Sequence, residues 1–453
     1  MQPHALTAAE AASLIRDRRL SAEELTRSCL DRIAAREALI RAWLFLDPDL
    51  ALRRAREADK RQAAGLPLGP LHGLPLGVKD VIDTADMPTT QNSAIYAGAQ
   101  IGRDAACVAV ARAAGALILG KTDTVEFAAG GRKALTRNPF NPAHTPGGSS
   151  SGSGAAVGDF MVPLGFGTQT AGSHIRPASF NNLYALKPSW SLVSREGLRM
   201  SAISLDTLGW FGRSVADLAL VAAAFRLPGL GAHGLGAHGL GAGPAPGVRS
   251  LRVGLCRSPV WERIEPAGAA ALETAARRLE AAGAIVEPLE LPAPFAGLTA
   301  ARDVIARHEG SAAFLPEYLA AHALLAPDIR ARVELRETFD AAGLLAAYAL
   351  ADACRPAFDA LFGPRLDVVL TPAAPGEAPE GLHTTGDWIF NGMWTLLHVP
   401  CLAIPCIRGP RGLPVGIQLV GPRLGDARLL AIAEACAPVI DAEPGWARAT
   451  LLS

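Results

Sequence analysis

The chain has 453 residues, of which 50% are hydrophobic and 19% are charged. This charged share is below the roughly 25% typical of globular proteins, which predicts a large buried core. Because 43 basic residues balance 43 acidic ones, the composition gives no indication of a polyanionic partner such as nucleic acid or of an acidic membrane surface.

The sequence shows no sign of secretion or of a membrane span. The N-terminal segment carries charge from Glu10 onward and lacks the apolar stretch of a secretory signal. The uncharged run 388–407 is interrupted by Asn391, Pro400 and Pro405, which favours buried sheet and turns. The seven cysteines include no CxxC pair, which argues against a disulfide framework. We therefore expect a cytoplasmic protein.

In chain order, helices alternate with short apolar strands. Two capping boxes, Thr7–Glu10 and Ser21–Glu24, each predict the start of a helix. Strands are predicted at 74–78, 116–120, 251–255, 284–291, 368–372 and 415–421, and helices at 104–115, 266–283 and 427–439. This alternation predicts an α/β fold in which helices cover the sheet.

The segment 227–247 differs from the rest of the chain. It repeats the letters GLGAH twice, contains little that could be buried, and is therefore predicted to be a flexible surface insertion within a single domain spanning 1–453. Its two histidines lie five residues apart in glycine-rich sequence, which is a poor scaffold for a metal site.

A dense cluster of serines and glycines, HTPGGSSSGSGAA, occupies residues 144–156. A linker is one interpretation, but the apolar sequence that follows leads directly into a core. A phosphate-binding loop is another, but the lysine of GxxxxGK[ST] is missing. Catalysis is the third: Gly148 to Gly152 matches GxSxG, although a serine-rich run produces this match by chance and no strand precedes it directly.

A second serine site, GTQTAGSHIRP, follows at 167–177. Ser173 comes after the small residues Ala171 and Gly172, and successive backbone N–H groups of this kind can form an oxyanion hole. A turn with a buried serine would have the same composition. Two such sites in one α/β core favour the catalytic interpretation.

A nucleophilic serine needs a base, and no histidine lies in a recognisable pairing. Lys79 closes the apolar strand LPLGV, so burial would lower its pKa. Neutrality near pH 7.5 requires a shift of roughly three units, or about 4 kcal/mol. Asp80 would oppose this shift, but adjacent side chains of a strand point to opposite faces. A lone lysine beside a strand is commonly a surface residue. Because the chain also carries two serine sites that need a base, we favour the interpretation that Lys79 is this base.

Together these segments closely resemble the amidase signature family of serine hydrolases. The family's lysine motif matches 77–80, its GGSS motif matches 147–150, and its nucleophile motif matches 167–178. The resemblance extends along nearly the whole chain and includes 204–219 and 412–422. It implies a large mixed, mostly central β-sheet covered by helices on both faces, and an enzyme without metal or other cofactor.

The resemblance also implies the catalytic roles. Ser173 is the expected nucleophile, Lys79 the base, and Ser149 a bridging serine that follows a cis peptide bond. The backbone N–H groups of Thr170, Ala171, Gly172 and Ser173 are expected to stabilise the oxyanion. An acyl-enzyme would form on Ser173 and then be hydrolysed by water.

Ala171 and three further residues near the nucleophile depart from the common GTDTGGSIR pattern. Gln169 and Arg176 are similar to a malonamidase-like branch in which the arginine holds a substrate carboxylate. Arg176 could equally be a structural ion-pair partner. His174 directly follows the nucleophile and could line the pocket or pack beside it. We expect all three to contribute to substrate binding.

The predicted activity is hydrolysis of C–N bonds in amides, with carbamates (urethanes) and aryl amides also attacked at the carbonyl and esters as a side reaction. The expected partner is the small substrate alone, with no nucleic acid or membrane, in a monomer or homodimer. One alternative is the glutaminase subunit of a tRNA-dependent amidotransferase, which would need partner chains. Another is a non-catalytic ligand-binding protein of the same fold.

Overall fold

The computed structural model describes residues 2–230, 247–338, 340–443 and 445–452. Most of the predicted insertion at 227–247 lies outside these residues, so the prediction for it is not tested. None of the helices in the described ranges is both long enough and apolar enough to cross a membrane.

A single sheet of eleven strands organises the described chain. In spatial order these strands are β1 (Trp43–Leu46), β3 (Leu117–Thr122), β2 (Pro75–Lys79), β4 (Leu164–Gln169), β6 (Thr207–Gly212), β5 (Tyr184–Lys187), β10 (Cys401–Arg408), β11 (Pro414–Val420), β9 (Val368–Pro372), β7 (Arg252–Leu255) and β8 (Ile285–Pro288). Pairing is parallel where β2 joins β3 and β4 and where β7 joins β8 and β9, and antiparallel elsewhere. The expected mixed sheet is therefore confirmed.

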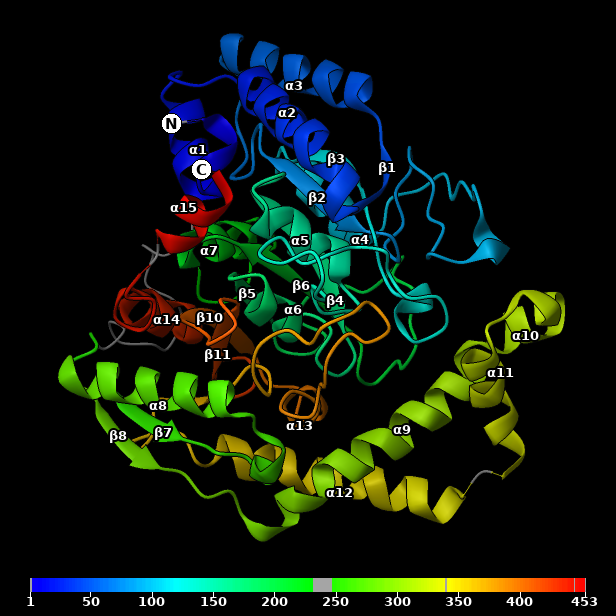
Figure 1. Cartoon of the computed structure of the whole chain (residues 1–453), viewed down its shortest axis with the longest axis vertical. Helices are drawn as coiled ribbons and strands as arrows, with labels where there is room; N and C mark the ends of the chain where they lie inside the picture. Colours follow the sequence, from blue (N-terminus) through cyan, green and yellow to red (C-terminus); the bar gives the residue numbers. More distant parts are fainter. Residues whose placement is uncertain (1, 231–246, 339, 444, 453) are drawn as a thin grey trace.

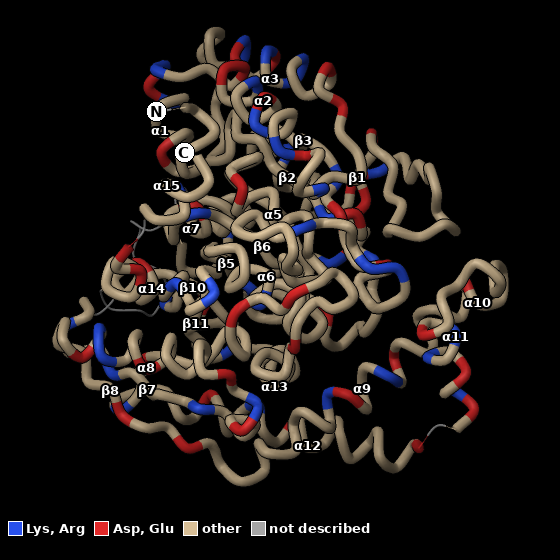
Figure 2. Tube along the Cα trace, in the orientation of Figure 1, with Lys and Arg blue, Asp and Glu red and all other residues tan. Residues whose placement is uncertain are grey.

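Helices surround this sheet (Figure 1). They are α1 (Ala8–Arg16), α2 (Ala22–Ile40), α3 (Pro48–Ala63), α4 (Ala106–Ala113), α5 (Ser151–Gly158), α6 (Ile175–Phe180), α7 (Val215–Ala224), α8 (Pro266–Ala281), α9 (Leu298–Ala313), α10 (Leu315–Ala321), α11 (Pro327–Glu334), α12 (Ala341–Asp359), α13 (Gly392–Leu396), α14 (Asp426–Ile440) and α15 (Trp446–Leu452). Basic and acidic residues are interspersed along them (Figure 2), in keeping with the zero net charge.

Neighbouring residues of β6 show that both faces of the sheet are covered. Trp210 donates from Nε1 to the Leu218 carbonyl of α7 at 3.0 Å and stacks on Phe225. Phe211, the next residue, instead packs against His174, just before α6, with ring centroids 3.9 Å apart. Because adjacent strand residues point to opposite faces, α7 and the segment leading into α6 lie on different sides of the sheet.

The predicted elements agree with the structure except in one region. Both capping boxes are present at the starts of α1 and α2. The run 388–407, expected to hold sheet and turns, contains the short helix α13 before β10 begins at Cys401. All residues of α13, from Gly392 to Leu396, are buried. The run was therefore correctly expected to be buried, but an uncharged apolar run does not distinguish a buried helix from a buried strand.

The central parallel strands determine where the serine motifs meet. Leu76 and Val78 of β2 pair with Leu164 and Phe166 of β4. Because parallel strands end at the same edge of a sheet, Lys79 at the end of β2 lies beside the loop that follows β4. That edge carries the site described next.

Candidate active site

Lys79 is fully buried, and hydroxyl groups surround its amine. Its Nζ lies 2.8 Å from Ser149 Oγ, 3.1 Å from Ser150 Oγ and 2.7 Å from Thr168 Oγ1. The contact with Ser149 is the one expected from the sequence. Thr168 was not expected; it reaches Lys79 because β4 runs parallel to β2.

Burial lowers the pKa of Lys79 to about 7, and the negative charge of Asp206 opposes this shift. Asp80 does not face Lys79: its carboxylate pairs with Lys121 at 3.2 Å on the other side of the strand. The expectation that Asp80 points away is confirmed. At neutral pH a large fraction of Lys79 is therefore the free amine.

The hydrogen bonds of Ser150 restrict which hydroxyl can give a proton to Lys79. Ser150 Oγ donates to the Thr168 carbonyl at 3.2 Å and accepts the Thr168 N–H at 3.2 Å. Its proton is therefore engaged, and it meets Lys79 as an acceptor. The Ser149 hydroxyl is free of such a bond among the described residues, so it can donate to the lone pair of a neutral Lys79.

The turn that carries Ser149 is held tightly against β3. The Gly148–Ser149 peptide bond is cis, as the family resemblance implied. Ser153 Oγ, in the first turn of α5, lies 2.6 Å from Thr122 Oγ1. A Cβ on Gly152 would lie 2.2 Å from the Ala42 carbonyl oxygen, so only glycine permits this approach.

The loop from Thr170 to Ser173 is shaped by two polar side chains behind it. Gln169 Oε1 accepts the N–H groups of His174 at 3.1 Å and Ile175 at 3.0 Å. Gln169 Nε2 donates to Thr395 Oγ1, which in turn donates to the Ala171 carbonyl at 2.8 Å. Within the described residues the N–H groups of Ala171, Gly172 and Ser173 have no backbone acceptor. These three donors can therefore serve a ligand.

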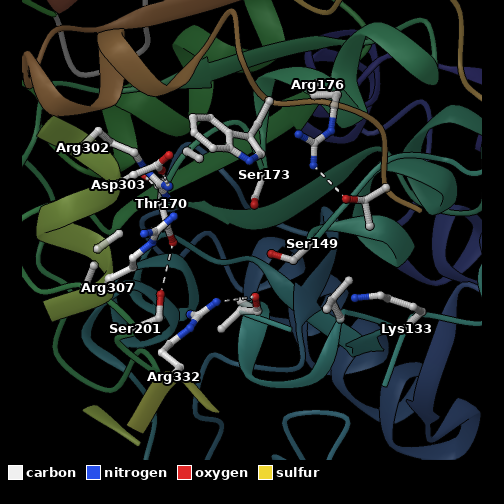
Figure 3. A pocket seen from close by; sticks show the side chains of 18 residues that line it. Lys133, Ser149, Thr170, Ser173, Arg176, Ser201, Arg302, Asp303, Arg307 and Arg332 are labelled. Atoms are coloured by element: carbon white, nitrogen blue, oxygen red, sulfur yellow. Dashed lines mark hydrogen bonds and ion pairs between the residues drawn. The ribbon is translucent and has the colours of Figure 1, made fainter. Parts of the chain in front are cut away.

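A cavity of about 380 Å³ opens over this loop. Both Ser149 and Ser173 line it, and their hydroxyls point into the space between them (Figure 3). The lining also contains five basic side chains: Lys133, Arg176, Arg302, Arg307 and Arg332. The single acidic side chain among the described residues of the lining, Asp303, pairs with Arg302 at 2.9 Å. The cavity is thus strongly positive.

Arg176 reaches this cavity from α6 and is 3% exposed. One of its nitrogens, Nη2, donates to the Gly148 carbonyl and, at 3.0 Å, to Thr385 Oγ1. Its Nε and Nη1 are buried without any acceptor in the described chain. Burial lowers the pKa of Arg176 to about 10, which still leaves the guanidinium charged at neutral pH.

The other two predicted substrate contacts do not line the cavity. His174 is fully buried behind the loop, where its Nε2 lies 3.1 Å from the Trp210 carbonyl. Burial lowers the pKa of His174 to about 3, so the ring is neutral. Gln169 is also buried and uses its amide to hold the loop. Both therefore position the nucleophile loop, because the β4–α6 connection turns their side chains into the core.

The basic residues opposite Arg176 were not found from the sequence. Arg302 and Arg307 lie on α9 and Arg332 lies on α11, more than a hundred residues after Ser173. No local motif marks them; only the packing of these helices brings them to the cavity. In the described residues no group of three or more His, Cys, Asp or Glu side chains could hold a metal ion.

The chain is similar to known proteins over most of its length. The family model described as Amidase matches residues 24–430. One subunit of the glutamyl-tRNA(Gln) amidotransferase of Chloroflexus aggregans is 35% identical over 97% of both chains. The peptide amidase of Stenotrophomonas maltophilia superposes with a TM-score of 0.79 at 29% identity, covering 96% of this chain and 97% of that one. A fatty acid amide hydrolase shares the fold, with a TM-score of 0.85 at 22% identity, over 97% and 85% of the two chains.

Proposed function

Since the chain belongs to the amidase family, we propose that it hydrolyses the C–N bond of amides that carry a carboxylate near the scissile carbonyl. Amide hydrolysis follows from the family, and the preference for an anionic substrate comes from the cavity. The observation that carries the proposal is Arg176, whose buried guanidinium has two unpartnered nitrogens in the cavity that Ser149 and Ser173 also line.

The proton relay begins at Lys79. Its neutral amine takes the Ser149 proton as Ser149 takes the proton of Ser173, so that the Ser173 Oγ attacks the carbonyl carbon. The N–H groups of Thr170, Ala171, Gly172 and Ser173 stabilise the resulting oxyanion, and losing one such donor typically costs about 3–4 kcal/mol of barrier.

Collapse of this intermediate breaks the C–N bond. The proton returns from Lys79 through Ser149 to the nitrogen, and the amine leaves while the acyl group stays on Ser173 as an ester. Water then attacks the ester by the same relay, which releases the carboxylic acid and restores Ser173.

Arg176 suits a carboxylate rather than a structural ion pair. Among the described residues no carboxylate lies within 4.0 Å of its guanidinium, and only the more distant charge of Asp387 opposes the cost of burying it. Its free Nε and Nη1 belong to the planar guanidinium, whose N–H donors can bind a carboxylate through two hydrogen bonds. A substrate carboxylate would satisfy both.

The test is a comparison of kcat/KM for malonamate and succinamate with kcat/KM for neutral amides, aryl amides and methyl carbamates. We expect the anionic amides to be preferred by at least about tenfold, as for a hydrogen-bonded charge. In Arg176→Ala this preference is lost, whereas Arg277→Ala, at an exposed arginine of α8 that does not line the cavity, keeps it. If neutral carbamates or anilides are the better substrates, the proposed preference is wrong.

A second candidate is supported by the curated relatives, which are subunits of glutamyl-tRNA(Gln) amidotransferases. In this role the substrate would be glutamine, and the chain would work with partner chains. The cavity argues against it, since the α-ammonium of glutamine would enter a space with five basic side chains and one acid that is already paired. Glutamine is therefore tested in the same substrate panel. A higher kcat/KM for glutamine than for succinamate, together with partner chains that co-purify with this protein, would establish the second candidate.

A further inference from the structure

Three arginines form a cluster on the side of the cavity opposite Arg176 (Figure 3). Arg302 and Arg307 extend from α9, and Arg332 extends from α11. The hydroxyls of Ser149 and Ser173 lie between this cluster and Arg176. The nucleophile therefore has basic groups on two sides.

The guanidinium groups of this cluster are held in place but remain largely unpaired. Arg302 stacks on the Trp388 ring at 4.5 Å and donates to the Thr170 carbonyl at 3.3 Å, while its buried Nε has no acceptor in the described chain. Arg332 donates to the Ala129 carbonyl at 3.3 Å and lies 5.8 Å from the Phe314 ring centroid. Arg307 is exposed at the rim.

The three arginines repel one another. Burial lowers the pKa of Arg332, and the charges of Arg302 and Arg307 lower it further, while the charges of Asp328 and Asp206 oppose this shift. Among the described residues of the lining Asp303 is the only acid, and it pairs with Arg302 alone. An arrangement of like charges costs free energy unless an anion enters it.

Several arginines elsewhere in this chain contact a carboxylate. Arg199 also lies near the Phe314 ring, at 5.0 Å, yet Glu317 binds it at 2.7 Å. Arg32 and Arg36 share the buried carboxylate of Asp159 at 3.0 and 3.1 Å. Arg307 and Arg332 have no such carboxylate among the described residues. Arg213 has none among them either, but it donates to four backbone carbonyls, whereas Arg332 donates to one.

We infer that Arg302, Arg307 and Arg332 bind a second anionic group of the substrate, a carboxylate or a phosphate. This inference rests on the proposed function and extends it: Arg176 holds one negative group and the cluster holds another on the opposite side of the scissile amide. Guanidinium groups suit both anions because their planar N–H donors match two oxygens at once. The substrate is thus a dianionic amide with charges on its acyl and amine parts.

The experiment uses amides of succinic acid that differ only in the leaving amine. N-Succinylglycine, N-succinyl-β-alanine and N-succinyl-γ-aminobutyrate carry a carboxylate at increasing distance, N-succinylphosphoethanolamine carries a phosphate, and each is paired with an uncharged counterpart. The measured quantity is the ratio of kcat/KM for the charged amide to that for its counterpart. We expect this ratio to be about 10 to 100 for at least one amide of the series, which is the effect of one hydrogen-bonded charged group.

Two variants link this ratio to the cluster. In Arg307→Met and in Arg332→Met we expect the ratio to fall about tenfold, because each removes donors to the anion. Arg336→Met, an exposed arginine just beyond α11 that does not line the cavity, is the matched control and keeps the ratio. Arg307 is exposed, so its variant tests the inference even if Arg332→Met does not fold.

The outcomes separate this inference from the proposed function. A preference for the phosphate member assigns the cluster to a phosphate, and a preference for a carboxylate member assigns it to a carboxylate. If no charged member exceeds its counterpart, or if Arg307→Met behaves like Arg336→Met, the inference is overturned. Failure of a fluorophosphonate to label Ser173 would instead overturn the proposed function.

Discussion

Lys79 and Lys121 lie on neighbouring parallel strands, and both are fully buried, but their surroundings differ. Lys121 pairs with the Asp80 carboxylate at 3.2 Å and donates to Thr89 Oγ1 at 2.6 Å. Among the described residues Lys79 meets only hydroxyl groups. In both residues burial lowers the pKa, but only Lys121 has a carboxylate in contact that opposes the shift.

The alternation of the β-strand explains this difference. Asp80 directly follows Lys79 in sequence, yet its side chain points to the opposite face and is used by Lys121. Two lysines of equal burial thus have different surroundings: one contacts a carboxylate, and the other, among the described residues, contacts only hydroxyl groups and can act as a base. Burial alone does not produce a base; the absence of a contacting carboxylate is also required.

The largest expected effect comes from replacing each lysine by methionine. Lys79→Met removes the proton acceptor of the relay, and we expect kcat/KM for succinamate to fall by about 10³- to 10⁴-fold. The measurement is steady-state hydrolysis at pH 8 with the fold checked by circular dichroism. If this variant keeps a tenth of the activity, Lys79 is not the base.

Lys121→Met is the matched control. It leaves Asp80 buried without its cation, so we expect it to lower the free energy of unfolding by about 3–5 kcal/mol in urea titrations. The folded fraction should still hydrolyse succinamate with the same dependence on pH. An altered pH profile would mean that the two lysines are not independent.

A smaller effect is expected from Asp206, whose charge raises the pKa of Lys79. Asp206→Asn removes this charge and keeps one oxygen that can accept from Thr170. Because the pKa of Lys79 then falls, more free amine exists below pH 7, and the ratio of kcat/KM at pH 6 to that at pH 9 should rise about twofold. Asp352→Asn, at an exposed carboxylate, should leave this ratio unchanged. If the ratio falls in Asp206→Asn, the Asp206 charge does not raise the pKa of Lys79.

The catalytic part of the site could be predicted from the sequence because its motifs are local. Lys79 ends an apolar strand, and Ser149 and Ser173 lie in short glycine-rich segments, so the residues indicated candidates. The resemblance to the amidase signature family then assigned the role of each. Six of the eleven strands in the described chain were predicted to within a few residues, whereas β1, β4, β5, β6 and β10 were not predicted individually, and the mixed sheet was expected from the resemblance.

The substrate-binding part could not be predicted in the same way. His174 and Gln169 neighbour the nucleophile in sequence, but the turn after β4 directs both side chains into the core. The arginines of α9 and α11 are distant in sequence and reach the cavity only through helix packing. Short local motifs are therefore a good guide to the relay, whose members lie far apart along the chain, and a poor guide to the pocket.

The central claim is that Lys79 is a neutral amine at the pH of the reaction. Its direct test is an NMR titration of protein labelled with ¹³C at lysine Cε, in which the Lys79 resonance is identified by its absence from Lys79→Met. The predicted result is a resonance that titrates with a pKa of about 7. A Lys79 amine that stays protonated well above neutral pH, like an ordinary lysine, would contradict the account.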